Sequence, residues 1–368
     1  MPIRMASCEG PQVEGQVVLV LQGGGALGAY QAGVYEALCG AGTEPDWVIG
    51  TSIGAFNAGI IAGNARENRL PRLRDFWKRV EQDSPFGYYA TLAGGIPALF
   101  APRPMTWGAN TQARVGLDAA SWYDTAPLRQ TLESLIDSKI LNETRTRLTV
   151  GAVNVRTSEM RYFDSRETAI TVEHVMASGA LPPAFPAVRI DGELYWDGGI
   201  LSNTPTEAIF DDDPRRDSLI FAVHMWNPMG PEPESIWEVL HRQKDIQYSS
   251  RVASHIARQR QVHKLRHVVS ELVKLMPDDV RNRAVVKDLA QYGCLTRMHV
   301  VQLLAPRLDN ENHTKDLDFS PAGISLRWEA GYADTRRALQ RAPWNDACDP
   351  LEGVILHQLE RDRAPAAG

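Results

Sequence analysis

Two stretches decide the fold of this chain: QVVLVLQGGGALG at residues 16–28 and WVIGTSIG at residues 47–54. In each stretch a short apolar run leads directly into a glycine-containing turn. A helical pattern of apolar residues then follows, over 26–41 and 53–62. Short apolar runs of this kind predict buried parallel strands. The resulting strand–helix–strand–helix order predicts an α/β fold, in which a mostly parallel sheet is covered by helices on both faces.

The remainder of the chain continues this order. Further strands are expected at 147–155 and 160–163, as a hairpin, and at 193–196, 218–225 and 298–304. Helices are expected at 66–82, 127–141, 171–178 and 320–342, and the stretch 235–275 is expected to form two helices. The segment 83–126 shows no regular pattern, which indicates either a lid or substrate wall or a loop packed on its own core.

The composition excludes several classes of protein. The chain has 368 residues and a formal net charge of −6, which gives no indication of nucleic-acid binding. Its four cysteines have no paired spacing, so neither a disulfide framework nor a metal site is expected. The first residues lack a signal-peptide core, and no apolar stretch reaches the length of a membrane span. We therefore expect a cytoplasmic protein without a cofactor.

The pentapeptide GTSIG, residues 50–54, places a serine on a sharp turn between a strand and a helix. The glycines Gly50 and Gly54 let the backbone turn, so that the Ser52 hydroxyl projects above the sheet while the helix beginning at Ile53 points its N-terminus toward it. A serine nucleophile also needs a base within hydrogen-bond reach and donors for the oxyanion. Ser52 is therefore the candidate nucleophile of a serine hydrolase.

A glycine-rich turn formed by Gly23, Gly24, Gly25, Ala26 and Gly28 offers backbone N–H groups to a developing negative charge. The same glycines match the G-x-G-x-x-G pattern of dinucleotide-binding folds, which require an acidic residue at the end of the second strand. Here that strand ends in the serine pentapeptide, and the nearest acidic residues precede it. The pattern therefore favours an oxyanion hole.

The base must come from elsewhere in the chain. None of the nine histidines follows a persuasive turn, whereas Asp197 ends a predicted strand and precedes Gly198 and Gly199. These glycines give the backbone freedom to aim the carboxylate. Asp197 is therefore the candidate base, and an aspartate that merely opens an ordinary turn is the alternative.

In order and approximate spacing, these three motifs resemble those of the patatin-like phospholipases. The resemblance covers residues 16 to about 225, and the proline-rich turn after Ser178 is also similar. It implies a three-layer α/β/α sandwich and hydrolysis of acyl esters by a dyad of Ser52 and Asp197, with backbone donors in the glycine turn. Many members carry an acidic residue where this chain has Gln22 and a basic one where it has Leu27. The substrate class that it implies is an acyl ester or lipid, of the phospholipase A or lysophospholipase type.

The resemblance also divides the chain into parts. We expect a flexible arm at 1–15, a catalytic domain at 16–232, a helical extension with a late strand at 233–345, and a tail at 346–368. The extension resembles that of a bacterial patatin-like subgroup linked to polyhydroxybutyrate metabolism. A hydrolase or accessory protein of that metabolism, and an acyltransferase using the same serine, are therefore the alternative functions.

Two further hypotheses follow from the residues. A conventional Ser-His-Asp triad would need a histidine such as His224 or His313, and a non-catalytic protein of a membrane or granule surface could keep the same fold.

The stretch 242–287 carries eleven basic and four acidic residues. A solvated helix face is the simplest interpretation, and peripheral contact with an anionic membrane or lipid granule is the alternative. The sequence leaves the oligomeric state unknown.

Overall fold

The computed structural model describes residues 15–81, 101–102, 116, 120–143, 145–308, 311 and 314–358. Residues 1–14 of the expected N-terminal arm lie outside these ranges, as does most of the irregular segment 83–126.

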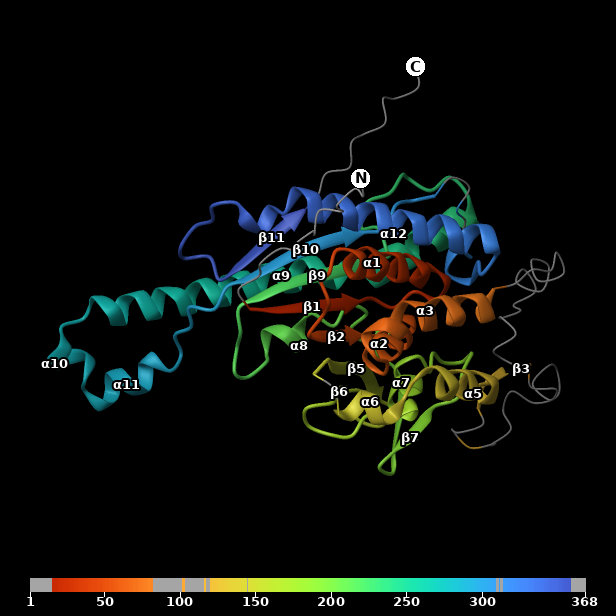
Figure 1. Ribbon diagram of the computed structural model, residues 1–368, viewed down its shortest axis with the longest axis horizontal. Coiled ribbons are helices and arrows are strands. Elements are labelled where there is room, and N and C mark those ends of the chain that lie inside the picture. The colour runs from red at the N-terminus through yellow and green to blue at the C-terminus, as the bar shows by residue number, and fades with distance from the viewer. Residues whose placement is uncertain are drawn as a thin grey trace, which may run out of the picture.

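A nine-stranded mixed sheet forms the centre of the molecule (Figure 1). Its strand order is β11-β10-β9-β1-β2-β5-β8-β7, and β6 pairs with β5. The six strands from β11 to β5 are parallel, whereas β6 and β8 run antiparallel to β5, and β7 runs antiparallel to β8. The strands are β1 (Gln16–Leu21), β2 (Trp47–Gly50), β5 (Arg147–Asn154), β6 (Met160–Asp164), β7 (Val188–Ile190), β8 (Glu193–Asp197), β9 (Ser218–His224), β10 (Met298–Leu304) and β11 (Val354–Gln358). A separate pair joins β3 (Ala101–Pro102) to β4 (Tyr123–Asp124).

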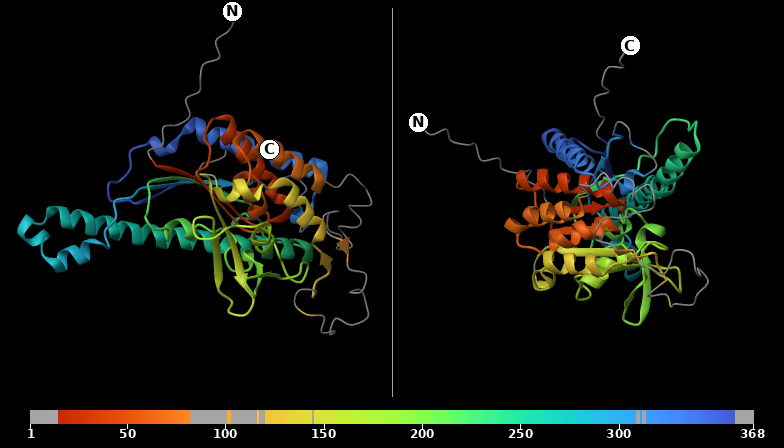
Figure 2. Two further views of the ribbon diagram at one scale, coloured as in Figure 1. Left: turned by 60° about the horizontal axis from the view of Figure 1, so that its bottom comes forward. Right: turned by 90° about the vertical axis from the view of Figure 1, so that its right-hand side faces the viewer.

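Helices cover both faces of this sheet (Figure 2). Alternate residues of β1 divide between two cores: Leu19 and Leu21 pack with one layer of helices, and Val18 and Val20 pack toward the other. The first layer contains α1 (Ala29–Gly40), α2 (Ile53–Ala62), α3 (Arg66–Val80) and α12 (Pro321–Arg341), and the second contains α8 (Glu207–Phe210) and α9 (Ile236–Leu275). The expected α/β sandwich with a mostly parallel sheet is confirmed.

The smaller elements complete the two layers. They are the helices α5 (Ala126–Leu135), α6 (Ser138–Glu143), α7 (Val172–Ser178), α10 (Asp278–Arg281) and α11 (Ala284–Ala290), and the 3₁₀ turns η1 (Gly25–Gly28), η2 (Gly198–Ile200), η3 (Lys315–Leu317) and η4 (Pro343–Asn345). The expected helix at 127–141 is divided into α5 and α6, which Ile136 and Asp137 separate.

Two expectations for the C-terminal part were wrong. The stretch 235–275 forms one helix, α9, because it contains neither glycine nor proline and ends just before Pro277. The expected tail at 346–368 contains β11, which pairs in parallel with β10 at the edge of the main sheet. Figure 1 shows the end of α9, with α10 and α11, projecting beyond the sheet. We call residues 265–292 the arm; this segment is distinct from the N-terminal arm expected at 1–15.

The C-terminal helix α12 packs on α1 at a very short distance, which two glycines permit. A Cβ atom on Gly33 of α1 would lie 1.9 Å from the carbonyl oxygen of Trp328. One on Gly331 of α12 would lie 2.0 Å from the carbonyl oxygen of Tyr30, and the Tyr30 hydroxyl donates to Asp334 over 2.8 Å. The extension is thus joined to the first helix of the α/β core by direct contact between backbones.

We predict that Gly33→Ala lowers the free energy of unfolding by about 1–3 kcal/mol, since the added methyl group must push two helix backbones apart. Gly40→Ala on the same helix is the matched control, because a Cβ there meets nothing within 4 Å. Helix propensity alone would favour alanine at both positions. Urea unfolding of both variants would measure the difference, and equal stability would contradict the close packing of α1 on α12.

Candidate active site

The turn that carries Ser52 is formed where β1 and β2 end side by side. Leu21 and Gly50 are paired in the parallel register. A Cβ on Gly50 would lie 2.3 Å from the carbonyl oxygen of Gly54, and a Cβ on Gly54 would lie 2.3 Å from that of Leu21. Only glycine fits at either position. Ser52 itself has φ 58° and ψ −128°, a backbone conformation that an L-residue adopts only under constraint.

A second serine holds this turn in place. The backbone N–H of Ser52 donates to the carbonyl oxygen of Ser178 over 3.0 Å and to its hydroxyl over 3.1 Å. The Ser178 hydroxyl in turn donates to the carbonyl oxygen of Gly151 on β5, over 2.6 Å. The end of α7 therefore ties the strained turn to the neighbouring strand.

Strand β5 brings Asp197 to Ser52, because its two halves have different partners. Residues 147–150 pair with β2, and residues 152–154 pair with β8. Ala152 stands opposite Asp197, so the last residue of β8 lies just beyond the end of β2. Ser52 and Asp197 line one cavity, and the nearby Ser52 hydroxyl lowers the pKa of the Asp197 carboxyl group. Residues about 145 positions apart in the chain therefore meet at one site.

The Asp197 carboxylate is almost completely buried, at 2% exposure. Burial raises its pKa from 3.8 to about 7, although the Ser52 hydroxyl and a hydrogen bond from the backbone of Gly199 oppose the rise. The Gly199 N–H lies 2.7 Å from Asp197 Oδ1. Gly198 is required for packing, because a Cβ there would lie 2.4 Å from the carbonyl oxygen of Gly151.

The glycine-rich turn leaves three donors without protein acceptors. Among the described residues, the N–H groups of Gly24, Gly25 and Ala26 make no hydrogen bond, as is usual for the first turn of a helix. Gly25 has φ +56°, and its α-carbon faces the carbonyl oxygen of Asp316, which would lie 2.2 Å from a Cβ. The N–H of Gly23 is already used, since it donates to the carbonyl oxygen of Asn203 over 3.1 Å.

These parts share one cavity of about 160 Å³. Its polar end contains Ser52, Asp197, Gly24 and Gly25. Its walls are apolar and come from both parts of the chain: Phe56, Phe76, Val80, Leu128, Leu181 and Phe185 from the first 232 residues, and Tyr248, Leu317 and Phe319 from the extension. The extension therefore forms part of the wall around Ser52.

Gly23, Ile53 and Gly199 also line this cavity, whereas the remaining predicted site residues do not: Ala26, Gly28, Gly50, Gly54 and Gly198. Gly28 packs against Ile53, whose Cγ1 would lie 2.7 Å from a Cβ on Gly28. His224 ends β9 and faces a different cavity, and burial lowers its pKa to about 4. His313 lies outside the described residues.

Sequence reasoning missed several residues that support the site. Asn203 fixes Gly23 through two hydrogen bonds. The side-chain amide of Asn203 donates to the Gly23 carbonyl oxygen over 3.0 Å, and the backbone carbonyl oxygen of Asn203 accepts from the Gly23 N–H. The indole N–H of Trp226 donates to the same Gly23 oxygen over 2.8 Å. Asn203 follows the Asp-Gly-Gly motif by only a few residues, which is a usable signal, whereas nothing in the sequence points to Trp226.

Gln22, which stands where many patatin-like proteins carry an acid, is completely buried. Its oxygen accepts from the backbone N–H groups of Met225 and Trp226, at 2.5 and 3.2 Å. Its nitrogen donates to the Thr204 hydroxyl and to the carbonyl oxygen of Tyr248, at 2.8 and 3.2 Å. A carboxylate could not supply the two donors, so this chain uses an amide to join β1, β9 and α9.

Comparisons with known proteins identify the family of this chain. A family model described as "Patatin-like phospholipase" matches residues 19–210, and one described as "Patatin phospholipase" matches residues 246–351. The chain is also similar to the crystal structure of VipD from Legionella pneumophila, with 17% identity and a TM-score of 0.38, over 89% of this chain and 67% of that one. No curated protein sequence matches.

The raised pKa of Asp197 predicts a pH-dependent stability. Because the folded-state pKa of about 7 exceeds the ordinary value of 3.8, the folded protein holds an extra proton between these pH values. The contribution of Asp197 to stability therefore falls as the pH rises through that window. We predict that Asp197→Asn gains stability relative to the wild type between about pH 4 and pH 8.

Urea unfolding at several pH values would measure this change. Any hydrogen bonds lost in the variant shift its free energy of unfolding equally at every pH. The change of this free energy with pH therefore reports the pKa of Asp197. Ser52→Ala, which keeps the buried carboxyl group but loses the hydroxyl that lowers its pKa, is the control; its stability should still fall with rising pH, and the fall should extend to a higher pH than in the wild type. A difference between Asp197→Asn and the wild type that stays constant across the window would rule out a raised pKa.

Proposed function

Because this chain belongs to the patatin-like phospholipase family, we propose that it is a serine hydrolase of acyl esters in which Ser52 is the nucleophile and Asp197 the base. The observation that carries the proposal is the meeting of the strained Ser52 and the buried carboxyl group of Asp197 in one largely apolar cavity. Membership of the family supports hydrolysis of lipids, and the assignment of Ser52 and Asp197 as the catalytic dyad is our proposal.

The environment of Asp197 supports a role as base. A solvated aspartate, with a pKa near 4, is a weak base at neutral pH. Burial raises the pKa of Asp197 to about 7, so the carboxylate binds the Ser52 proton more strongly as the hydroxyl attacks. The hydrogen bond from Gly199 fixes one carboxylate oxygen, which keeps the other side of the group available to Ser52.

The proposed reaction has two steps. Ser52 Oγ attacks the ester carbonyl carbon while Asp197 takes its proton, and the resulting oxyanion accepts hydrogen bonds from the amides of the glycine turn, with Gly24 and Gly25 lining the cavity. Collapse of this intermediate expels the alcohol, which takes the proton from Asp197, and leaves an acyl-Ser52. Asp197 then deprotonates water, which attacks the acyl carbon. The bond from the acyl carbon to Ser52 Oγ breaks, Oγ takes the proton back from Asp197, and the acid is released.

The lining of the cavity supports an acyl chain as the bound part of the substrate. Phenylalanine and leucine side chains dominate its walls, and the only charged residues among the described lining are Asp197 and Asp316. Asp316 is paired with Lys244 over 2.8 Å. No described lining residue is cationic, so we propose uncharged or zwitterionic lipids and simple esters as substrates in preference to anionic ones.

We predict that Ser52→Ala and Asp197→Asn each lower kcat/KM on p-nitrophenyl esters by at least about a thousandfold, because the nucleophile and its base act as a unit. Ser325→Ala at an exposed position and Asp75→Asn at a half-buried position, both outside the Ser52 cavity, are matched controls. A fluorophosphonate probe should label the wild type and not Ser52→Ala. Wild-type turnover by Ser52→Ala would disprove the proposal, and probe labelling with acyl transfer to an added alcohol as the main product would favour an acyltransferase.

The arm supports a second, independent proposal, a contact with anionic lipid surfaces. Six large apolar side chains on the arm are more than half exposed: Leu265, Leu272, Leu275, Val285, Leu289 and Tyr292. Lys274 and Arg281 pair with acids one turn away, whereas Arg283 and Lys287 have no ion-pair partner among the described residues.

The arm leaves the body at the amino ends of the strands, opposite to Ser52, so such a contact would serve as a tether (Figure 1). None of the helices in the described part of the chain has the length and apolar character needed to cross a membrane.

We predict that the protein floats with vesicles containing anionic phospholipid and not with purely zwitterionic vesicles. The double variant Arg283→Glu/Lys287→Glu should lose flotation, since each basic residue near an anionic surface contributes about 1 kcal/mol. Arg72→Glu, an exposed charge reversal on α3, is the control. Equal recovery of the protein with both vesicle types would contradict the proposed lipid contact and indicate that the arm is simply solvated.

A further inference from the structure

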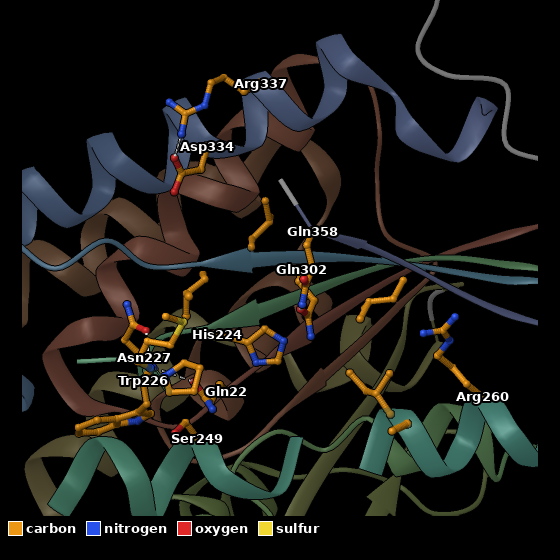
Figure 3. Close-up of a pocket in the computed structure, with 17 residues that line it drawn as sticks. Gln22, His224, Trp226, Asn227, Ser249, Arg260, Gln302, Asp334, Arg337 and Gln358 are labelled. Atoms are coloured by element: carbon orange, nitrogen blue, oxygen red, sulfur yellow. Dashed lines mark hydrogen bonds and ion pairs between the residues drawn. The ribbon is translucent and has the colours of Figure 1, made fainter. Parts of the chain in front are cut away.

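A second and larger cavity, of about 530 Å³, lies beside the Ser52 cavity (Figure 3). The carboxyl ends of β9, β10 and β11 form one wall, and α9 forms another. Figure 3 shows His224 between the strands and α9, with Arg260 on α9 and Arg337 on α12. A volume of this size lies within the range typical of ligand sites, unlike that of the Ser52 cavity.

The alternation of side chains along parallel strands explains the polar groups in this cavity. On the sheet face that α9 covers, β1 and β9 place the apolar residues Val20 and Ala222 in register. Two positions further on, the same face carries Gln22 and His224, at the carboxyl ends of these strands. On β10 and β11, Gln302 and Gln358 are likewise in register, and their side chains are hydrogen-bonded over 2.9 Å. The apolar cluster on this face of the sheet is therefore bordered, at the carboxyl ends of the strands, by a row of polar side chains.

His224 is the unexplained member of this row. Its side chain is only 6% exposed, and its buried Nε2 atom has no hydrogen-bond partner among the described residues. Desolvation lowers its pKa to about 4, so the ring is neutral near pH 7 and offers one N–H donor and one acceptor. A buried polar atom without a partner costs free energy, and a ligand with a polar group at this point would recover it.

The rest of the lining indicates the chemical class of the ligand. Most of the other contacts are apolar, from Met229, Ile256, Leu304 and Leu356. At the rim, Arg260 pairs with Glu352 over 3.0 Å and remains 43% exposed, and Arg337 pairs with Asp334. Each arginine is therefore paired with one carboxylate, but Arg260 uses only Nη2 in its pair and keeps further N–H donors for a ligand. We propose that this cavity binds a long-chain carboxylate, with its chain on the apolar wall and its head group between His224 and Arg260.

The two cavities share a wall. Trp226 lines both, and Gln22, which holds the backbone of Trp226, lines the second. The Trp226 indole packs against the Tyr248 ring with the two planes tilted by 35° and the ring centres 4.8 Å apart, and Tyr248 lines the Ser52 cavity. The proposal does not depend on the activity of Ser52, but its test must separate binding in the two cavities.

Calorimetric titration with dodecanoate below its micelle concentration tests the proposal. Ala257 is exposed on α9 and lines the second cavity, so Ala257→Trp should fill it and weaken binding at least about tenfold. Ala284→Trp, at an exposed site on the arm, is the matched control. Leu181→Trp narrows the Ser52 cavity instead and should leave dodecanoate binding unchanged.

His224→Phe separates a binding role from a structural one. Phenylalanine removes the unpartnered Nε2 atom, so the variant should be at least as stable as the wild type, yet it should bind dodecanoate about tenfold more weakly. Dodecanol should bind more weakly than dodecanoate. No saturable binding, or equal binding by Ala257→Trp and the wild type, would overturn the proposal. Loss of binding in Leu181→Trp alone would place the ligand in the Ser52 cavity, and equal affinity for dodecanol would refute the carboxylate assignment.

Discussion

The candidate site depends on how closely the backbone packs at the carboxyl ends of β1 and β2. The carbonyl oxygens of Leu21 and Gly54 occupy the space where side chains would begin at Gly54 and Gly50. This packing forces Ser52 into positive φ, and Ser178 holds the strained turn by two hydrogen bonds to the Ser52 N–H. A strained residue persists only where its surroundings over-determine it, and here three strands and two helices do so.

The C-terminal extension forms part of the wall around Ser52 and packs directly on the first helix of the α/β core. Gly33 and Gly331 join α12 to α1 through backbone contact, and the carbonyl oxygen of Asp316 packs against Gly25 of the glycine turn. A buried ion pair between Lys315 and Asp245, 2.7 Å long, fixes η3 against α9. The extension therefore restrains the amides proposed for the oxyanion hole, and its side chains close one side of the acyl cavity.

Burial sets the character of both cavities. In the first, it raises the pKa of Asp197 while Gly199 supplies a hydrogen bond, which is a suitable arrangement for a base. In the second, it lowers the pKa of His224, which keeps the ring neutral and leaves Nε2 without a partner. The same physical effect thus suits Asp197 to the role proposed for it as a base, and keeps His224 neutral, with one donor and one acceptor for a ligand.

The sequence by itself determined the α/β fold and the three glycine-containing motifs, because apolar runs and glycine spacings are local features. It also placed Asp197 at the end of a strand. It missed the continuity of α9 and the strand β11, and it did not reveal Ser178, Asn203, Gln22 or Trp226 as supports. Only the tertiary structure decided those contacts, since strand pairing brings together residues separated by 100 positions or more, and no local pattern records which buried polar groups will meet.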